Sequence, residues 1–135
     1  MKRTFTQVLL FLWLTLSTLA AYAQSDALLA ARNAISNGSS RDLAQQFANT
    51  VELGFDGDKQ NYSATQAEFV MKDFFAKNAS SGFEYIHKGA SPEGAPYAIG
   101  KYTSKSSSYR VFVKMKFFNG VIKIDTIDFT KLDTE

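Results

Sequence analysis

Apolar side chains follow a helical period in the first part of the chain. Residues 26–36 carry one apolar stripe, which predicts a helix. Residues 40–48 predict a second, short helix that Ser40 caps. A strand is expected over residues 50–55, and glycine-containing residues 56–60 predict the turn that follows it.

The clearest helix comes directly after this turn. Ser63 and Gln66 fit a capping box, in which each side chain satisfies the other residue's backbone amide. The apolar residues behind this cap lie at helical spacing: Ala67, Val70, Met71, Phe74 and Phe75. Aromatic side chains at this spacing are typical of a core, so we expect the two phenylalanines to pack inward. The alternative is that one of them lines a pocket.

After residue 80 the apolar period changes from helical to alternating. Four segments predict strands: residues 82–89, 96–104, 107–118 and 121–129. Strict alternation in the first of them would place three rings on one face: Phe83, Tyr85 and His87. Asn119-Gly120 is the favoured hairpin turn between the last two strands. The alternation slips near Thr126, which indicates a β-bulge.

This order of elements, helices first and strands afterwards, predicts an α+β fold. We expect N-terminal helices packed on one bent antiparallel sheet.

Residues 1–23 have the pattern of a secretory signal peptide. Lys2 and Arg3 precede an apolar run that is short for a membrane span, and Ala-Tyr-Ala ends at Ala23. We expect cleavage after Ala23, a single domain over residues 24–135, and a periplasmic or secreted location with no transmembrane segment after cleavage. The chain has no cysteine, which excludes a lipoprotein anchor, disulfides and thiolate metal sites.

Charge and motifs limit the partners. Without Lys2 and Arg3, 13 basic side chains remain against 13 acidic ones, so we expect no nucleic-acid partner. Asp56 and Asp58 lack the further oxygen ligands of a calcium loop, and we expect a solvated turn there. No motif indicates a cofactor or a metal site.

Four segments resemble a known family: "YSATQAEFVMKDFF" (62–75), "FEYIHKG" (83–89), "YAIGKY" (97–102) and "YRVFVKMK" (109–116). The chain is similar to small exported Bacteroidetes proteins of unknown function with a nuclear transport factor 2-like, cystatin-like cone fold. The resemblance implies this fold and a cell-envelope setting. It implies no activity, because the wider superfamily contains isomerases, dehydratases and non-catalytic binders, and the fold does not choose among them.

The cone fold places a candidate pocket between the helix at 64–77 and the concave sheet. We expect four residues near it: Phe74, Tyr85, His87 and Tyr102. His87 is the only histidine and a candidate general acid or base. The alternative is an ordinary strand histidine, which we favour because no acid–base partner can be placed by spacing.

A second candidate is an interaction face on the strand at 107–118. Its members lie at alternate positions: Arg110, Phe112, Lys114, Lys116 and Phe118. The alternative is a solvated sheet face, which would leave two phenylalanines exposed.

Three functions follow from these candidates. The first is a non-catalytic module that binds a small apolar ligand or an envelope protein. The second is an isomerase- or dehydratase-like enzyme that uses His87. The third is a homodimerisation or interaction module that uses the outer face of the sheet.

Overall fold

The structure is a computed structural model that describes residues 26–133. The predicted signal peptide, residues 1–23, lies outside this range. Residues 26–36 are helical, as expected. The remaining elements are α2 (Ser40–Ala44), β1 (Phe47–Phe55), β2 (Asp58–Ser63), α3 (Ala64–Lys77), β3 (Ser80–Ala90), β4 (Pro96–Ser104), β5 (Ser108–Phe118) and β6 (Val121–Lys131).

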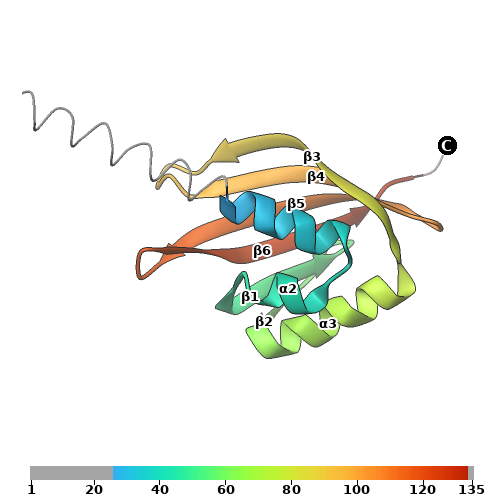
Figure 1. The fold of residues 1–135 in the computed structure, drawn as a ribbon, viewed down its shortest axis with the longest axis horizontal. Helices are drawn as coiled ribbons and strands as arrows, with labels where there is room; N and C mark the ends of the chain where they lie inside the picture. Colours follow the sequence, from blue (N-terminus) through green and yellow to red (C-terminus); the bar gives the residue numbers. More distant parts are fainter. Residues whose placement is uncertain (1–25, 134–135) are drawn as a thin grey trace, which may run out of the picture.

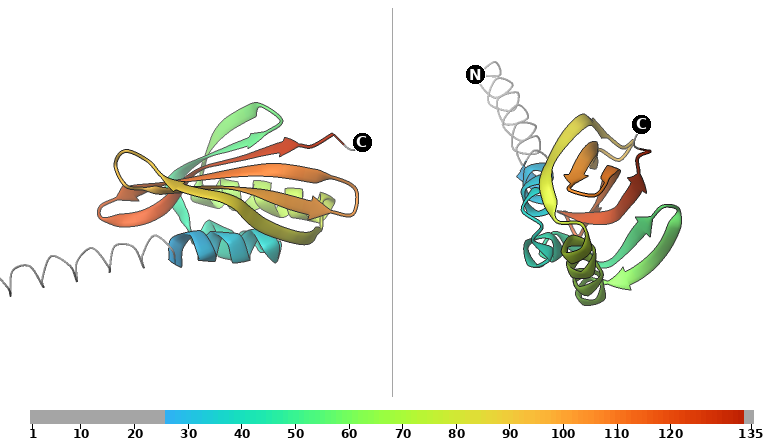
Figure 2. Two further views of the ribbon diagram at one scale, coloured as in Figure 1. Left: turned by 90° about the horizontal axis from the view of Figure 1, so that it is seen from above. Right: turned by 90° about the vertical axis from the view of Figure 1, so that its right-hand side faces the viewer.

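The six strands form one bent sheet in the order β2-β1-β6-β5-β4-β3. The helices lie along one face of this sheet, and the opposite face carries none of the described helices (Figures 1 and 2). The predicted α+β class is therefore confirmed. The expectation of a wholly antiparallel sheet is wrong at one pair, because β1 and β6 run parallel. The strands β3 to β6 form a meander, and the β1–β2 hairpin extends it because β1 lies beside β6, the last strand in the chain.

Two predicted boundaries are wrong. α2 ends at Ala44 and not at residue 48, because Phe47 already pairs with Ile124 in the sheet. The turn predicted over residues 56–60 is only Asp56 and Gly57, which have φ angles of 53° and 88°. Two residues with positive φ close a tight hairpin, so β2 begins at once.

Other local predictions are confirmed. Ser63 and Gln66 form both hydrogen bonds of the capping box at the start of α3. The register between β5 and β6 shifts where Lys114 pairs with Thr126 and Met115 pairs with Ile124, so Asp125 is the extra residue of a β-bulge. The slip in apolar alternation near Thr126 correctly indicated this β-bulge.

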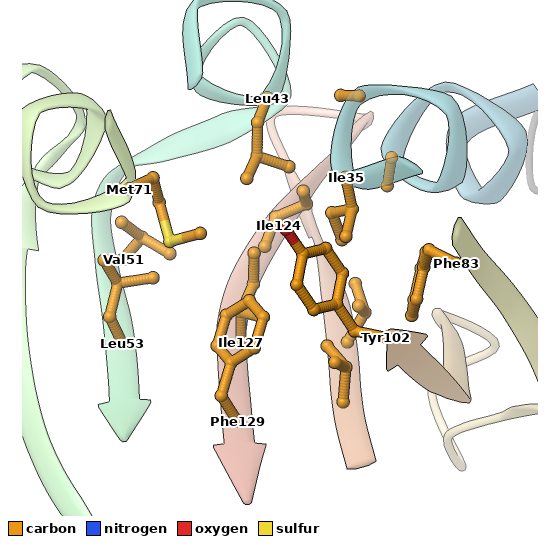
Figure 3. Packing of buried hydrophobic residues seen from close by; sticks show 14 of the residues in the cluster. Ile35, Leu43, Val51, Leu53, Met71, Phe83, Tyr102, Ile124, Ile127 and Phe129 are labelled. Atoms are coloured by element: carbon orange, nitrogen blue, oxygen red, sulfur yellow. The ribbon is translucent and has the colours of Figure 1, made fainter. Parts of the chain in front are cut away.

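The core fills the space between the helices and the sheet. Figure 3 shows Ile35, Leu43 and Met71 from three helices meeting side chains of the strands. Phe74 lies at its aromatic centre, with ring centroids 5.3 Å from Phe55, 5.3 Å from Tyr109 and 4.5 Å from Phe129. Phe74 and Phe75 are 8% and 7% exposed, so both rings pack inward as predicted.

We predict that Phe74→Ala lowers the free energy of unfolding by about 3–5 kcal/mol, because it removes a buried ring and leaves a cavity. Urea denaturation followed by circular dichroism measures the loss. Phe69→Ala is the matched control on the same helix, since Phe69 is 65% exposed. A loss for Phe74→Ala no larger than that of the control would contradict the central position of this ring.

Candidate functional site

The four residues of the predicted pocket do not line one cavity. Phe74 and Tyr102 pack together in the core, with ring centroids 5.8 Å apart. The Tyr102 hydroxyl donates a hydrogen bond of 2.5 Å to the backbone carbonyl of Asn78, and burial raises the pKa of Tyr102 above its ordinary value. Phe74 borders a hollow of about 310 Å³ beside Asn78 and Tyr109, at the end of α3. Neither Tyr85 nor His87 belongs to the lining of that hollow.

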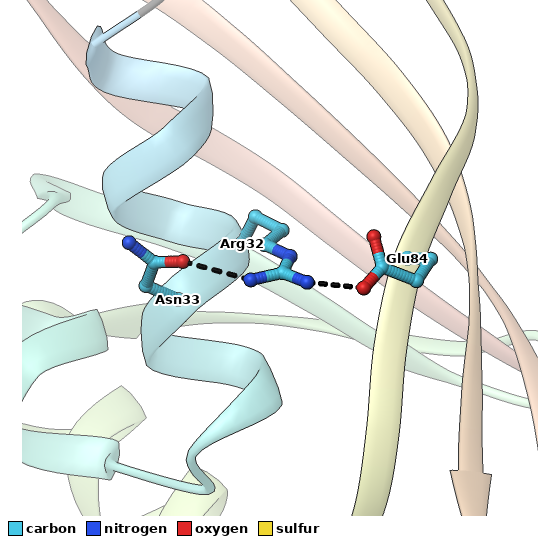
Figure 4. A network of polar contacts seen from close by, with 3 residues as sticks. All are labelled: Arg32, Asn33 and Glu84. Atoms are coloured by element: carbon cyan, nitrogen blue, oxygen red, sulfur yellow. Dashed lines mark hydrogen bonds and ion pairs between the residues drawn. The ribbon is translucent and has the colours of Figure 1, made fainter.

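Tyr85 joins the N-terminal helix to β3. Its hydroxyl donates a hydrogen bond of 2.8 Å to the backbone carbonyl of Leu28. Burial raises the pKa of Tyr85 above its ordinary value, and the positive charge of Arg32 opposes that shift. Arg32 itself forms an ion pair with Glu84 (Figure 4). These contacts hold the helix against the sheet edge, which is a structural role.

His87 lies on the other face of the sheet because of a β-bulge. Tyr85 pairs with Gly100 but His87 pairs with Ile99, so Ile86 is an extra residue between them. The prediction that His87 shares a face with Phe83 and Tyr85 is therefore wrong. His87 is exposed, and its ring centroid lies 5.9 Å from that of Tyr97.

The helix-free face has a continuous cross-strand row at its centre. The row passes through all six strands in spatial order: Lys59, Gly54, Asp128, Phe112, Ile99 and His87. Around Phe112 it borders a hollow of about 410 Å³, which Arg110 and Thr130 also line. Aromatic side chains continue beside the row, because the ring centroids of Tyr97 and Phe112 are 6.0 Å apart.

Gly54 leaves space for Asp128, which lines this hollow. A Cβ atom at residue 54 would collide with the carboxylate of Asp128, which occupies the space that the missing side chain leaves. One oxygen of this carboxylate, Oδ2, lies 3.6 Å from Lys59 Nζ. The other, Oδ1, is buried and has no hydrogen-bond partner within the described part of the chain.

The charges on this face are only partly paired. Lys116 lies 3.5 Å from Asp125. Arg110 and Lys101 lie directly opposite each other on β5 and β4, an unfavourable arrangement of like charges. Neither cation has an ion pair among residues 26–133, and the same holds for Lys114 and for the acidic Glu52.

All five residues of the predicted interaction face therefore lie on the helix-free side. The alternate positions of β5 bring together Arg110, Phe112, Lys114, Lys116 and Phe118. Sequence reasoning missed their neighbours from other strands: Lys59, Gly54, Asp128, Ile99 and Tyr97. The Asn119-Gly120 turn indicated that the last strand lies beside β5, but no signal in the sequence placed Gly54 of β1 and Lys59 of β2 on the same face.

Residues 26–133 contain no cluster of three or more metal-ligating His, Asp or Glu side chains. Within the same range, none of the helices has both the length and the apolar character that a membrane crossing requires.

We predict that Gly54→Ala destabilises the fold by about 1–3 kcal/mol, the usual range for an overpacked site. Asp128→Ala in the same chain should relieve the collision, so the double variant should lose less stability than the sum of the two single variants. Urea denaturation of all three variants measures this coupling. Gly82→Ala is the control, because a Cβ there meets nothing within 4 Å. Additive losses would contradict the contact between residues 54 and 128.

Comparisons with known proteins agree with this fold. A DUF4783 protein of Bacteroides ovatus has a solved structure that is 28% identical, covering 78% of this chain and 94% of that one, with a TM-score of 0.74. A nuclear transport factor 2-like protein of unknown function from Shewanella baltica is 10% identical, covering 87% and 97%, with a TM-score of 0.65. A cystatin-like protein from Caulobacter vibrioides is 13% identical, covering 84% and 90%, with a TM-score of 0.64.

The search of curated proteins finds no significant match to this sequence. The family model described as a domain of unknown function, DUF4783, matches residues 29–130. This range contains α2, α3 and nearly all of the six-stranded sheet. The chain therefore belongs to the DUF4783 family, and its fold is that of nuclear transport factor 2-like proteins.

Proposed function

We propose that this protein is a non-catalytic protein-binding module, that its binding surface is the helix-free face of the sheet, and that its partner is a second copy of the chain. The observation that carries the proposal is the group of incompletely buried aromatic and aliphatic side chains around the central row. This group consists of Tyr97, Ile99, Phe112 and Phe118, with Phe118 38% exposed. Exposed apolar side chains rimmed by polar groups mark interaction surfaces.

The packing of the opposite face also supports this choice. The rings of Phe74, Tyr102 and Phe129 occupy the interior where a small apolar ligand was expected. The hollow beside Phe74 is instead bordered by charged groups, among them Asp56, Asp73 and Lys77. Phe55, Val70 and Tyr109 also line that hollow, so a small apolar ligand at the end of α3 is the alternative to a protein partner.

The unpaired charges favour a second copy as the partner. In a two-fold dimer each contact is made twice, so one favourable pair of unlike charges counts twice. The helix-free face offers unpaired cations at Arg110 and Lys101, and an unpaired carboxylate at Glu52. A self-complementary contact between them would relieve the repulsion between the two cations.

An isomerase-like enzyme has less support. Its candidate base, His87, lies outside the cone on the helix-free face. Among the described residues, His87 has no hydrogen bond and no ion pair to an acidic side chain. A general acid or base in this fold would require such a partner inside an enclosed site.

We predict that residues 24–135 form a dimer at micromolar concentration and that Phe112→Asp converts it to a monomer, because the substitution places a charge at the centre of the apolar group. Sedimentation equilibrium measures the mass, and circular dichroism verifies that the variant is folded. Phe69→Asp is the matched control: it places the same charge on α3, at a side chain that is 65% exposed. A monomeric wild type at every accessible concentration, or a dimer that survives Phe112→Asp, would overturn the proposal.

A further inference from the structure

The β5–β6 hairpin ends in an apolar tip that the proposed dimer surface explains only in part, because that surface includes Phe118 alone of the three exposed apolar residues in the tip. We define the hairpin tip as residues 116–123. Phe117, Phe118 and Val121 are 45%, 38% and 54% exposed, although all three are large apolar residues. Asn119 and Gly120 close the turn with φ angles of 51° and 78°. Three exposed apolar side chains are thus concentrated at one end of the sheet.

Two lysines stand directly behind the apolar residues. Lys116 and Lys123 are cross-strand partners, while Phe117 pairs with Ile122 and Phe118 pairs with Val121. Like charges directly opposite each other destabilise a sheet. Lys116 is partly compensated by Asp125 at 3.5 Å, and Lys123 Nζ donates to the backbone carbonyl of Gln45 at 3.0 Å. The hairpin tip itself contains no acidic residue.

The dimensions of the hairpin tip fit the surface layer of a bilayer. Each strand residue advances the chain by about 3.3 Å, so the turn at Asn119 projects about 10 Å beyond Lys116. Amphipathic helices in the membrane interface bury their apolar face about 5–10 Å into the headgroup and acyl boundary, and lysine side chains extend so that their charged ends stay in water. The spacing of apolar and basic residues in the hairpin tip matches this arrangement.

The placement of the hairpin tip leaves it accessible. Figure 1 shows the hairpin projecting at one end of the sheet, past the helices, and Figure 2 shows the same projection from above. Phe117 lies at an odd position of β5 and Phe112 at an even one, so the two side chains point to opposite faces of the sheet. A copy bound at Phe112 would therefore leave Phe117 uncovered.

We propose that the hairpin tip inserts into the surface of an anionic phospholipid bilayer. Phe117, Phe118 and Val121 enter the headgroup and acyl boundary, and Lys116 and Lys123 contact the lipid phosphates. Apolar insertion provides affinity, and the two lysines provide the preference for anionic lipid.

A single tryptophan reporter tests insertion at a named position. Trp13 is the only tryptophan and lies in the predicted signal peptide, so residues 24–135 have none. This segment retains every described residue and so the whole sheet with its helices. Phe117→Trp should shift its emission to the blue on vesicles of phosphatidylglycerol and phosphatidylethanolamine. Phe69→Trp on α3 is the control and should not shift.

Binding variants test the two parts of the proposal separately, by flotation with the same vesicles. Phe117→Ser with Val121→Ser should weaken binding at least about tenfold, because apolar burial is lost. Lys116→Gln with Lys123→Gln should remove the preference over phosphatidylcholine vesicles and the dependence on salt. Phe69→Ser should bind like the wild type.

Three results would overturn the proposal. The first is an unchanged Phe117→Trp spectrum with anionic vesicles. The second is an equal shift for Phe69→Trp. The third is a blue shift that grows with protein concentration without lipid, which would assign the hairpin tip to contact between copies. Phe112→Asp separates this proposal from the proposed dimer. If the variant is monomeric and still binds vesicles, the hairpin tip binds lipid without the dimer.

Discussion

The packing of the Phe74 ring is the contact on which the rest of this structure depends. It brings one helix against aromatic residues from four strands: Phe55 on β1, Tyr102 on β4, Tyr109 on β5 and Phe129 on β6. The helix end is held in the same place, because the hydroxyls of Tyr102 and Tyr109 donate to Asn78. With the concave side filled in this way, the helix-free face is the side on which we propose a partner.

Two β-bulges decide which side chains reach that face. The extra residue Ile86 moves His87 to the face opposite Tyr85, and the extra residue Asp125 lets both Ile124 and Ile127 point inward. The bulge at Asp125 could be predicted, because apolar residues change parity on either side of it. The bulge at Ile86 could not, because an aromatic residue at every second position is compatible with strict alternation. The prediction that His87 lies in the cone pocket assumed strict alternation along β3, and the bulge at Ile86 breaks that alternation.

Local patterns predicted what depends on neighbouring residues, such as the capping box of α3, the Asn119-Gly120 turn and the alternation of β5. They could not predict what depends on the order of strands in space. Gly54 lies far from Asp128 and Phe112 along the chain and becomes their neighbour only because β1 lies beside β6. The position of β1 beside β6, and hence the hollow, belongs to the tertiary structure. The apolar periodicity of the sequence cannot predict it.

The parallel pairing of β1 with β6 has a consequence for how the chain folds. It joins residues near the start of the domain to residues near its end, for example Phe55 to Phe129. Non-local pairings of this kind slow folding, since a long loop must close before the contact forms. A chain that emerges with its N-terminus first leaves β1 without its central neighbour until almost the last residue has appeared. The sheet therefore cannot be completed in stages, and a C-terminal truncation that removes β6 would split it into two separate pieces.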